Sequence, residues 1–325
     1  MQASAITFAF GRSLLPFGIA LLLGGCEPTP QPPPPPRPSA SIAQQPTAAP
    51  APPEPTVSGA PIALRDVEAA TNPGRLPPYD GPTGILEGSV RIAGDPAPEV
   101  PLTLPASCTG AERTYGRLFR EGENRAAADV LIAVTGYRAY IPVRGQAVTV
   151  TIKDCAFSAR TFSMTFGQHM EVENLDETNS YIPVLQGSRF TAFSVAVPKG
   201  REGKPIKSDP VRLYPHRVGQ YELADNMNRP WMSADVFVLK YPTHTVTGID
   251  GRFRLEGIPV GDVQVDALLP SADLSESKKI TISAGKTTEL DLVLRFDQKT
   301  NRGKTRPHPI QSAAASSTPT AADVK

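Results

Sequence analysis

The sequence predicts an all-β fold built as antiparallel sandwiches, and three observations lead to that prediction. Many short segments alternate apolar and polar residues, so that every second side chain falls on the same face of a strand. Gly, Pro, Asn and Asp separate these segments at intervals of roughly 8 to 15 residues, which is typical of sandwiches. Helical periodicity is almost absent. The length of the patterned region fits one large or two small β domains.

The expected strands follow one another through residues 84–296. The segment "GILEGSVRIAG" places Ile85, Val90 and Ile92 among small or polar neighbours. The segment "ADVLIAV" is a short apolar run, and "QAVTVTI" alternates again. Later strands are expected in "RTFSMTF", "HMEVEN", "FSVAV", "PVRLY", "DVFVLKY", "THTVTG", "RFRLEG", "DVQVDALL", "KKITIS" and "TTELDLVLRF".

The amino terminus predicts export. Residues 1–25 contain Arg12 and then the apolar run "SLLPFGIALLLGGC", which is too short to span a membrane and indicates a signal peptide. Its last four residues, Leu23-Gly24-Gly25-Cys26, resemble the lipobox of bacterial lipoproteins. That resemblance implies that Cys26 becomes the mature terminus and carries acyl chains that anchor the chain. Glu27 favours the outer membrane. The alternative is an ordinary secretory signal with a coincidental cysteine.

Two further segments are too polar or too proline-rich to build a core. Residues 26–83 begin with the lipidated cysteine and continue as a Pro-rich linker, whose prolines remove backbone donors. Proline-rich tracts can also be ligands for aromatic grooves, but a spacer is favoured in an exported lipoprotein. Residues 297–325 are polar, small and aperiodic, and we expect a disordered tail.

Two long stretches resemble a known combination of families. They are "DCAFSARTFSMTFGQHMEVENLDETNSYIP" and "VGQYELADNMNRPWMSADVFVLKYPTHTVTGIDGRFRLEGIPVGDVQVDALLP". They resemble exported cupredoxin-like proteins joined to a carboxypeptidase-regulatory-like (transthyretin-like) module. The resemblance implies a Greek-key cupredoxin-like sandwich over residues 84–239 and a small transthyretin-like or Ig-like sandwich over residues 240–296. In the second, the turn Asp250-Gly251 is expected to form a hairpin, since glycine accepts a positive φ.

The same resemblance implies that copper ligands have been lost. Copper-binding relatives place a histidine shortly after the segment that is Asn174-Leu175-Asp176 here, and Cys-x-x-His-x-x-Met in the loop between the last two strands. Two imidazoles and a thiolate, with a long axial methionine, hold copper in such sites. In this chain Asn226 stands in the place of the thiolate and Arg229 in that of the histidine, so that only Met232 remains. The resemblance therefore implies a domain without a bound metal or other cofactor.

The loop that carries Trp231 is then expected to pack rather than to bind an ion. Its indole ring would cover the open end of the sandwich, with the indole N–H bonded to a protein group or water. Alternatively, Asn226, Asn228, Arg229 and Trp231 form a polar recognition patch at that end.

Copper remains the alternative cofactor. Met164, Met170, Met227 and Met232 are the methionines of the mature chain, and thioethers suit Cu(I), although scattered methionines usually fill a core. His169 and Met170 are adjacent on an expected strand and therefore point to opposite faces. The candidates for a rearranged copper site are Met232, His169 and Met170.

Cys108 and Cys155 are the two thiols that remain after lipidation. Export places them in an oxidising compartment, where an even pair usually forms a disulfide. The alternative is a free Cys155 on a strand.

Composition and motifs argue against two classes of function, nucleic-acid binding and catalysis. A formal net charge of +1 gives no basic surface for nucleic acid. The chain has neither Gly-x-Ser-x-Gly nor an evident Ser/His/Asp set, so no enzyme is predicted. His244 is expected to be a surface or turn histidine rather than a metal ligand. We expect a non-catalytic lipoprotein, anchored in the membrane by acyl chains, that binds or scaffolds an envelope protein or a glycan. The alternative is a copper-handling or electron-transfer protein.

Overall fold

A computed structural model of the chain describes residues 62–145, 147–176, 179–186 and 210–301. The expected signal peptide, the lipidation site Cys26, and most of the linker and tail lie outside these residues. Within them the chain is mostly β-structure, which confirms the predicted all-β fold. No helix in this described part combines the length and apolar character needed to cross a membrane.

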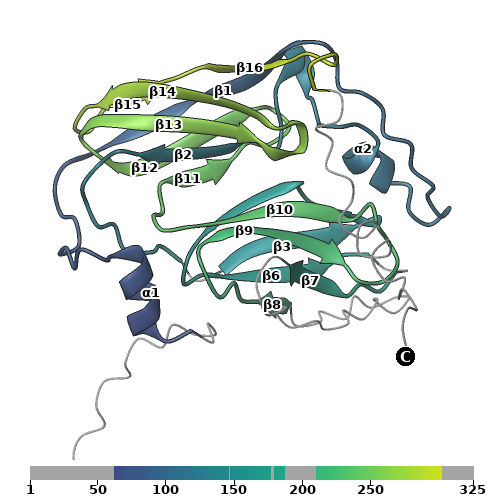
Figure 1. Cartoon of the computed structure of the whole chain (residues 1–325), viewed down its shortest axis with the longest axis horizontal. Helices are drawn as coiled ribbons and strands as arrows, with labels where there is room; N and C mark the ends of the chain where they lie inside the picture. Colours follow the sequence, from purple (N-terminus) through teal and green to yellow (C-terminus); the bar gives the residue numbers. More distant parts are fainter. Residues whose placement is uncertain (1–61, 146, 177–178, 187–209, 302–325) are drawn as a thin grey trace, which may run out of the picture. The chain divides into compact units, whose positions relative to one another are not determined.

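The strands form two sandwiches, and each has its own apolar core (Figure 1). The first is called the terminal sandwich here, because its strands come from both ends of the described chain. One of its sheets has the order β12-β1-β15, with β16 also paired to β1, and the other has the order β11-β2-β13-β14. The strands are β1 (Thr83–Gly94), β2 (Leu131–Thr135), β11 (His244–Val246), β12 (Arg252–Pro259), β13 (Gly261–Leu269), β14 (Leu274–Ile282), β15 (Thr287–Glu289) and β16 (Leu292–Phe296).

The second, called the inserted sandwich, is built from one continuous stretch of chain between β2 and β11. Its sheets have the orders β4-β3-β6-β8 and β5-β10-β9-β7. The strands are β3 (Ala147–Lys153), β4 (Ala156–Phe157), β5 (Thr161–Thr165), β6 (His169–Asn174), β7 (Pro183–Gln186), β8 (Val211–Leu213), β9 (Gly219–Asp225) and β10 (Ser233–Leu239). The described residues also form the short helices α1 (Leu64–Thr71), α2 (Ala111–Tyr115), η1 (Glu123–Arg125) and η2 (Pro270–Ala272).

The strand pairing departs from the domain boundary expected after residue 239. Strand β1 pairs with β12, β15 and β16, and β2 pairs with β11 and β13. Residues 84–135 therefore contribute strands to the sandwich that was expected to begin only at residue 240. Alternation along a strand says which side chains face a core, but it does not say which other strand lies beside it.

The sheets are mixed rather than purely antiparallel, and the expected hairpin is absent. Strands β3 and β6 run parallel, as do β5 and β10, and β1 is parallel to β15 and β16. Asp250-Gly251 does form a turn, in which Gly251 has φ +70 and an added Cβ would lie 2.5 Å from the Val90 carbonyl oxygen. However, the turn joins β11 to β12, which belong to opposite sheets, so it is a crossover between layers.

Alternating burial explains why these segments form strands. Along β13, Val263, Val265, Ala267 and Leu269 are buried while their neighbours are more exposed. Burying a Val or Leu side chain contributes about 1.5–3 kcal/mol, so one such row is a large part of a domain's stability. The same alternation in β12 and β16 builds the other wall of this core.

The predicted disulfide between Cys108 and Cys155 is confirmed, with a Cα–Cα distance of 5.0 Å. It ties the irregular segment between β1 and β2 to the turn between β3 and β4. The two cysteines are 47 residues apart. In the chain-entropy model, closing a loop of that length stabilises the fold by about 4 kcal/mol.

The described part of the expected linker contains a helix. Helix α1 lies within residues 26–83, and its one buried residue, Val67, packs into the core of the inserted sandwich. Gly167, with φ +103, makes this contact possible, because an added Cβ would come 2.7 Å from Val67 Cγ1. The expected spacer is therefore interrupted by a helix that packs on the fold, and prolines resume after it at residues 73, 77, 78 and 82.

Candidate functional site

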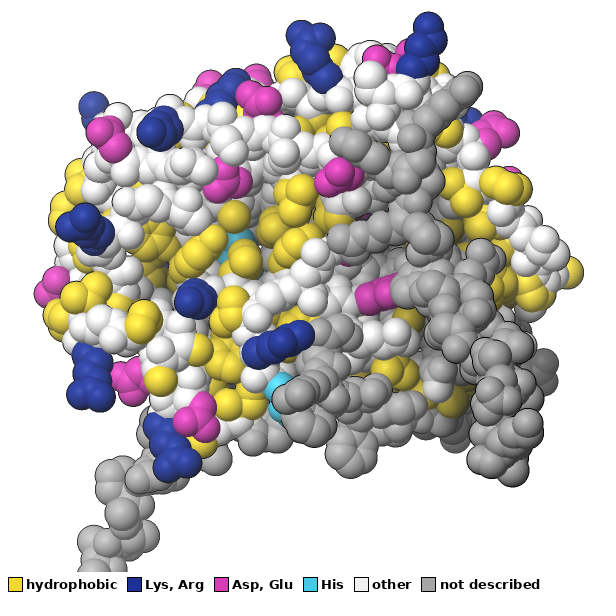
Figure 2. All heavy atoms as spheres, in the orientation of Figure 1, with side chains coloured by type: hydrophobic (Ala, Val, Ile, Leu, Met, Phe, Trp, Pro, Cys, Tyr) yellow, Lys and Arg dark blue, Asp and Glu magenta, His cyan; other side chains and the backbone are white. Residues whose placement is uncertain are grey.

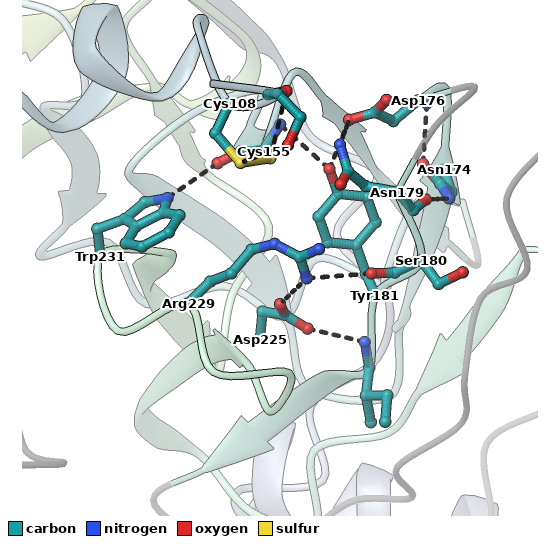
Figure 3. Close-up of polar contacts among 12 residues, drawn as sticks. Cys108, Cys155, Asn174, Asp176, Asn179, Ser180, Tyr181, Asp225, Arg229 and Trp231 are labelled. Atoms are coloured by element: carbon teal, nitrogen blue, oxygen red, sulfur yellow. Dashed lines mark hydrogen bonds and ion pairs between the residues drawn. A yellow bond between two sulfur atoms is a disulfide. The ribbon is translucent and has the colours of Figure 1, made fainter. Parts of the chain in front are cut away.

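A buried ion pair ties the β9–β10 loop to the segment before β7. Asp225 ends β9, and Arg229 Nη1 lies 2.7 Å from its Oδ2. The same nitrogen donates to the Ser180 carbonyl at 3.0 Å, and the guanidinium carbon lies 4.6 Å from the centre of the Tyr181 ring. The other Asp225 oxygen accepts the Ile182 amide at 2.8 Å. Figure 3 shows the Arg229 side chain pointing inward among these groups.

The Tyr181 hydroxyl continues this network. It donates to Asp176 Oδ2 at 2.6 Å and accepts from the Cys155 amide at 3.1 Å. The Asn179 side chain donates to the same Asp176 oxygen at 3.1 Å (Figure 3). Burial raises the pKa of the Tyr181 phenol and Asp176 raises it further, so the hydroxyl stays a donor. The residues Asp176, Tyr181, Asp225, Arg229 and Trp231 are called the closed end below.

Trp231 completes the closed end. Its side chain is buried in the core of the inserted sandwich, and the indole N–H donates to the Cys155 carbonyl at 3.3 Å. Asn226 and Asn228 are exposed, whereas Arg229 and Trp231 turn inward. The four residues considered for a polar recognition patch therefore do not share one surface.

The residues considered for copper lie in different surroundings. Met232, Met170 and Met164 belong to the apolar core of the inserted sandwich. His169 is bonded to Glu171, with 3.1 Å between Nε2 and Oε1. Met227, by contrast, is 40% exposed.

No group of three or more His, Cys, Asp or Glu residues in the described part of the chain could hold a metal ion. The inward guanidinium of Arg229 places a positive charge at the closed end, where it would repel a metal cation. The residues present at the closed end therefore do not fit a copper ion.

A second buried ionic group joins the two sandwiches. Asp129, just before β2, accepts two bonds from the Arg120 guanidinium at 2.7 and 2.6 Å. It also accepts the amide of Arg160, just before β5, at 2.8 Å. The Arg160 side chain returns to the carbonyls of Arg117 and Leu118 at 2.8 and 2.9 Å. Sequence reasoning missed this group because Asp129 lies inside the apolar run "ADVLIAV".

His244 also connects the sandwiches, although it was expected at the surface. Its Nδ1 lies 2.8 Å from Ser163 Oγ and its Nε2 lies 3.1 Å from Thr165 Oγ1, so β11 is bonded to β5. Burial lowers the pKa of His244 to about 4. The ring is therefore neutral at neutral pH and exchanges hydrogen bonds with hydroxyl groups.

A groove of about 480 Å³ lies beside this contact and is called the junction groove below. Residues 242–248, which contain all of β11, line it without interruption. Ile141, Val148 and Phe162 contribute apolar wall, and Arg144 contributes a cation. Figure 2 shows hydrophobic side chains gathered in the hollowed middle of the face that it presents.

No protein-family model matches the chain, and the search of curated proteins found no match. Among solved structures, the chain is similar to a copper-containing nitrite reductase from Thermus scotoductus SA-01, at 16% sequence identity and a TM-score of 0.23. The similarity covers 32% of this chain and 25% of that one, so the chain spans about a quarter of that protein's length. A likeness of this size carries no conclusion about this chain's activity.

Proposed function

We propose that this chain is an exported, lipid-anchored binding protein without catalytic or redox activity. Cys26 carries the acyl chains, a Pro-rich spacer follows, and the two sandwiches present a surface to a partner in the cell envelope. The proposal includes the family assignment. The inserted sandwich is cupredoxin-like, and the terminal sandwich is carboxypeptidase-regulatory-like, with strands that both precede and follow the inserted sandwich in the sequence.

The observation that carries the proposal is the filled closed end. The side-chain exposures of Arg229 and Asp225 are 14% and 0%, and the guanidinium of Arg229 lies against the Tyr181 ring. Electron transfer by copper needs sulfur and imidazole ligands that are free to bind the metal. The groups at the closed end are instead hydrogen-bonded to one another and to nearby backbone. Such a network supports the fold of a binding module rather than redox chemistry.

Copper retention tests this proposal. Purified chain is incubated separately with Cu(I) and Cu(II) and desalted, and the metal per chain is measured by mass spectrometry together with absorption spectra. We expect no retained copper. A variant that restores both ligand types in the loop, Asn226→Cys with Arg229→His, shows whether the method detects a site placed there. Near-stoichiometric copper in the unaltered chain would contradict the proposal and support the copper-handling alternative.

The anchor is tested separately. In cells fed with labelled palmitate, we expect label on the chain and recovery of the chain in the outer-membrane fraction. The Cys26→Ser variant should lose both the label and the membrane fraction, because one thiol carries the acyl chains. Equal labelling of the variant would contradict lipidation at Cys26.

A further inference from the structure

Strand β11 is an edge strand, and all three of its residues line the junction groove. In its sheet it pairs with β2 only. The neighbouring bonds fix the pattern, because Val134 N donates to the Thr243 carbonyl at 2.9 Å and Thr247 N donates to the Val130 carbonyl at 3.0 Å. In an antiparallel ladder, alternate residues bond to opposite sides. Thr245 therefore bonds to β2, and the backbone groups of His244 and Val246 point away from it.

These outward backbone groups have no backbone partner in the part of the chain that the structure describes. The His244 ring is bonded to Ser163 and Thr165, so the side chain does not occupy the hydrogen-bonding groups of its own backbone. A row of free N–H and C=O groups is the surface to which an added strand binds.

The groove offers more than backbone groups. Ile141, Val148 and Phe162 provide apolar wall, which suits alternate side chains of an extended segment. None of the ion pairs between described residues involves the Arg144 guanidinium, and Glu256, the acidic residue that also lines the groove, is bonded to Arg254 at 2.9 Å. An acidic side chain would complement this charge.

We propose that the junction groove binds an extended, proline-free peptide segment of an envelope protein, which adds a strand to the open edge of β11. The segment carries apolar side chains at alternate positions and an acidic residue beside Arg144. The inference rests on the proposed function, since it names the partner class of the binding protein. The chain's own Pro-rich spacer is a poor occupant, because proline removes the N–H that an added strand must donate.

Synthetic peptides test the proposal on the full-length chain purified in detergent. The probes are two fluorescein-labelled hexapeptides of alternating valine and threonine. One carries an aspartate at its amino end and the other carries it at its carboxyl end, and fluorescence anisotropy measures binding. We expect micromolar affinity for at least one of them. Hydrogen exchange should show new protection of the His244 and Val246 amides. The same peptide with N-methyl groups at alternate residues should not bind, because it keeps the side chains but lacks the donors.

Two variants of one residue form the matched pair. Val246→Pro removes an outward N–H that does not bond to β2. We expect about tenfold weaker peptide binding, because the peptide loses this hydrogen bond and the adjacent one is distorted. Val246→Ala keeps the N–H and should weaken binding less than about threefold. Arg144→Gln should remove the preference for aspartate. Circular dichroism and the melting temperature check that each variant is folded.

Several outcomes overturn the proposal. Failure of every peptide in the set does so, as does equal binding of the N-methylated peptide. Protection of the same two amides by a neutral oligosaccharide such as maltotetraose, but by no peptide, would make the groove a glycan site instead. Copper retention is measured independently, so a copper-free chain that binds no peptide refutes this inference and leaves the proposed function standing.

Discussion

The closed end of the inserted sandwich and the open edge of β11 are both polar, but they differ in where their hydrogen bonds go. At the closed end, Asp225, Arg229 and Tyr181 are bonded to one another and to nearby backbone. At the edge, the backbone groups of His244 and Val246 point away from β2, and both residues line the junction groove. Polar groups satisfied within the protein stabilise it, whereas unsatisfied groups beside a cavity are available to a ligand.

The largest effect that would break this comparison comes from Asp225→Ala. It leaves the Arg229 guanidinium buried without its carboxylate, and we expect the free energy of unfolding to fall by about 3 kcal/mol in urea titrations. Glu99→Ala is the control, because Glu99 and Arg117 form an exposed pair at 3.5 Å, and its change should stay below about 0.5 kcal/mol. Equal losses in both variants would contradict a structural role for the closed end.

The contact made by His244 predicts a dependence on pH. Its pKa is lowered from 6.5 to about 4 in the folded chain, so the unfolded chain binds more protons between these values. Stability should therefore fall as the pH drops from about 6.5 to 4, and should level off with respect to this group below that. We expect a loss on the order of 2 kcal/mol, reduced by solvent screening of the partly exposed ring.

The measurement compares urea unfolding of the unaltered chain and His244→Asn at pH 7 and pH 4.5. The variant keeps a hydrogen-bonding side chain but has no proton to gain, so its stability should change less with pH. If both chains lose the same amount, His244 is not the group responsible.

Tyr181→Phe should have a smaller effect at the closed end. It removes the hydroxyl between Asp176 and the Cys155 amide but keeps the ring under Arg229, and we expect a loss of about 1.5 kcal/mol in thermal or urea unfolding. Tyr79→Phe is the matched control, since its hydroxyl makes an exposed bond to the Pro82 carbonyl. A loss no greater than that of the control would mean that the hydroxyl network adds little.

The smallest change in the free energy of unfolding is expected for a variant at the open edge of β11. Val246→Pro should change the free energy of unfolding by less than about 1 kcal/mol, because proline is tolerated where the N–H faces away from the ladder. Thr245→Pro removes a donor that pairs with β2 and should cost about 3 kcal/mol. Similar losses at the two positions would mean that the assignment of outward and inward groups along β11 is wrong.

Local patterns predicted the fold class, but not the connections between strands. The alternation in residues 84–94 indicates a strand with one buried face, yet nothing in it selects β12 and β16 as neighbours. That choice depends on contacts between segments about 160 to 200 residues apart, whose pairing is set by the packing of the whole core.

The sites show the same limit. Two cysteines in a chain whose amino terminus predicts export are enough to predict the Cys108–Cys155 disulfide, because an even pair in an oxidising compartment usually forms a bridge. The bonds of Arg229 to Asp225 and Ser180 depend on a loop conformation and on a segment that precedes β7, so the sequence alone indicates a charged loop and not its partners. Asp129 looks like an interruption in an apolar strand until Arg120 and Arg160 are brought to it.

The pairing of β1 with β16 has a mechanical consequence. The two strands run parallel, with Val90 opposite Leu292 and Gly94 opposite Phe296. A chain held at its amino end and pulled at its carboxyl end would load this pair in shear, so that its hydrogen bonds share the tension instead of opening one at a time. The inserted sandwich lies in the sequence between β2 and β11, so it would carry none of this tension while β1 and β16 remain paired.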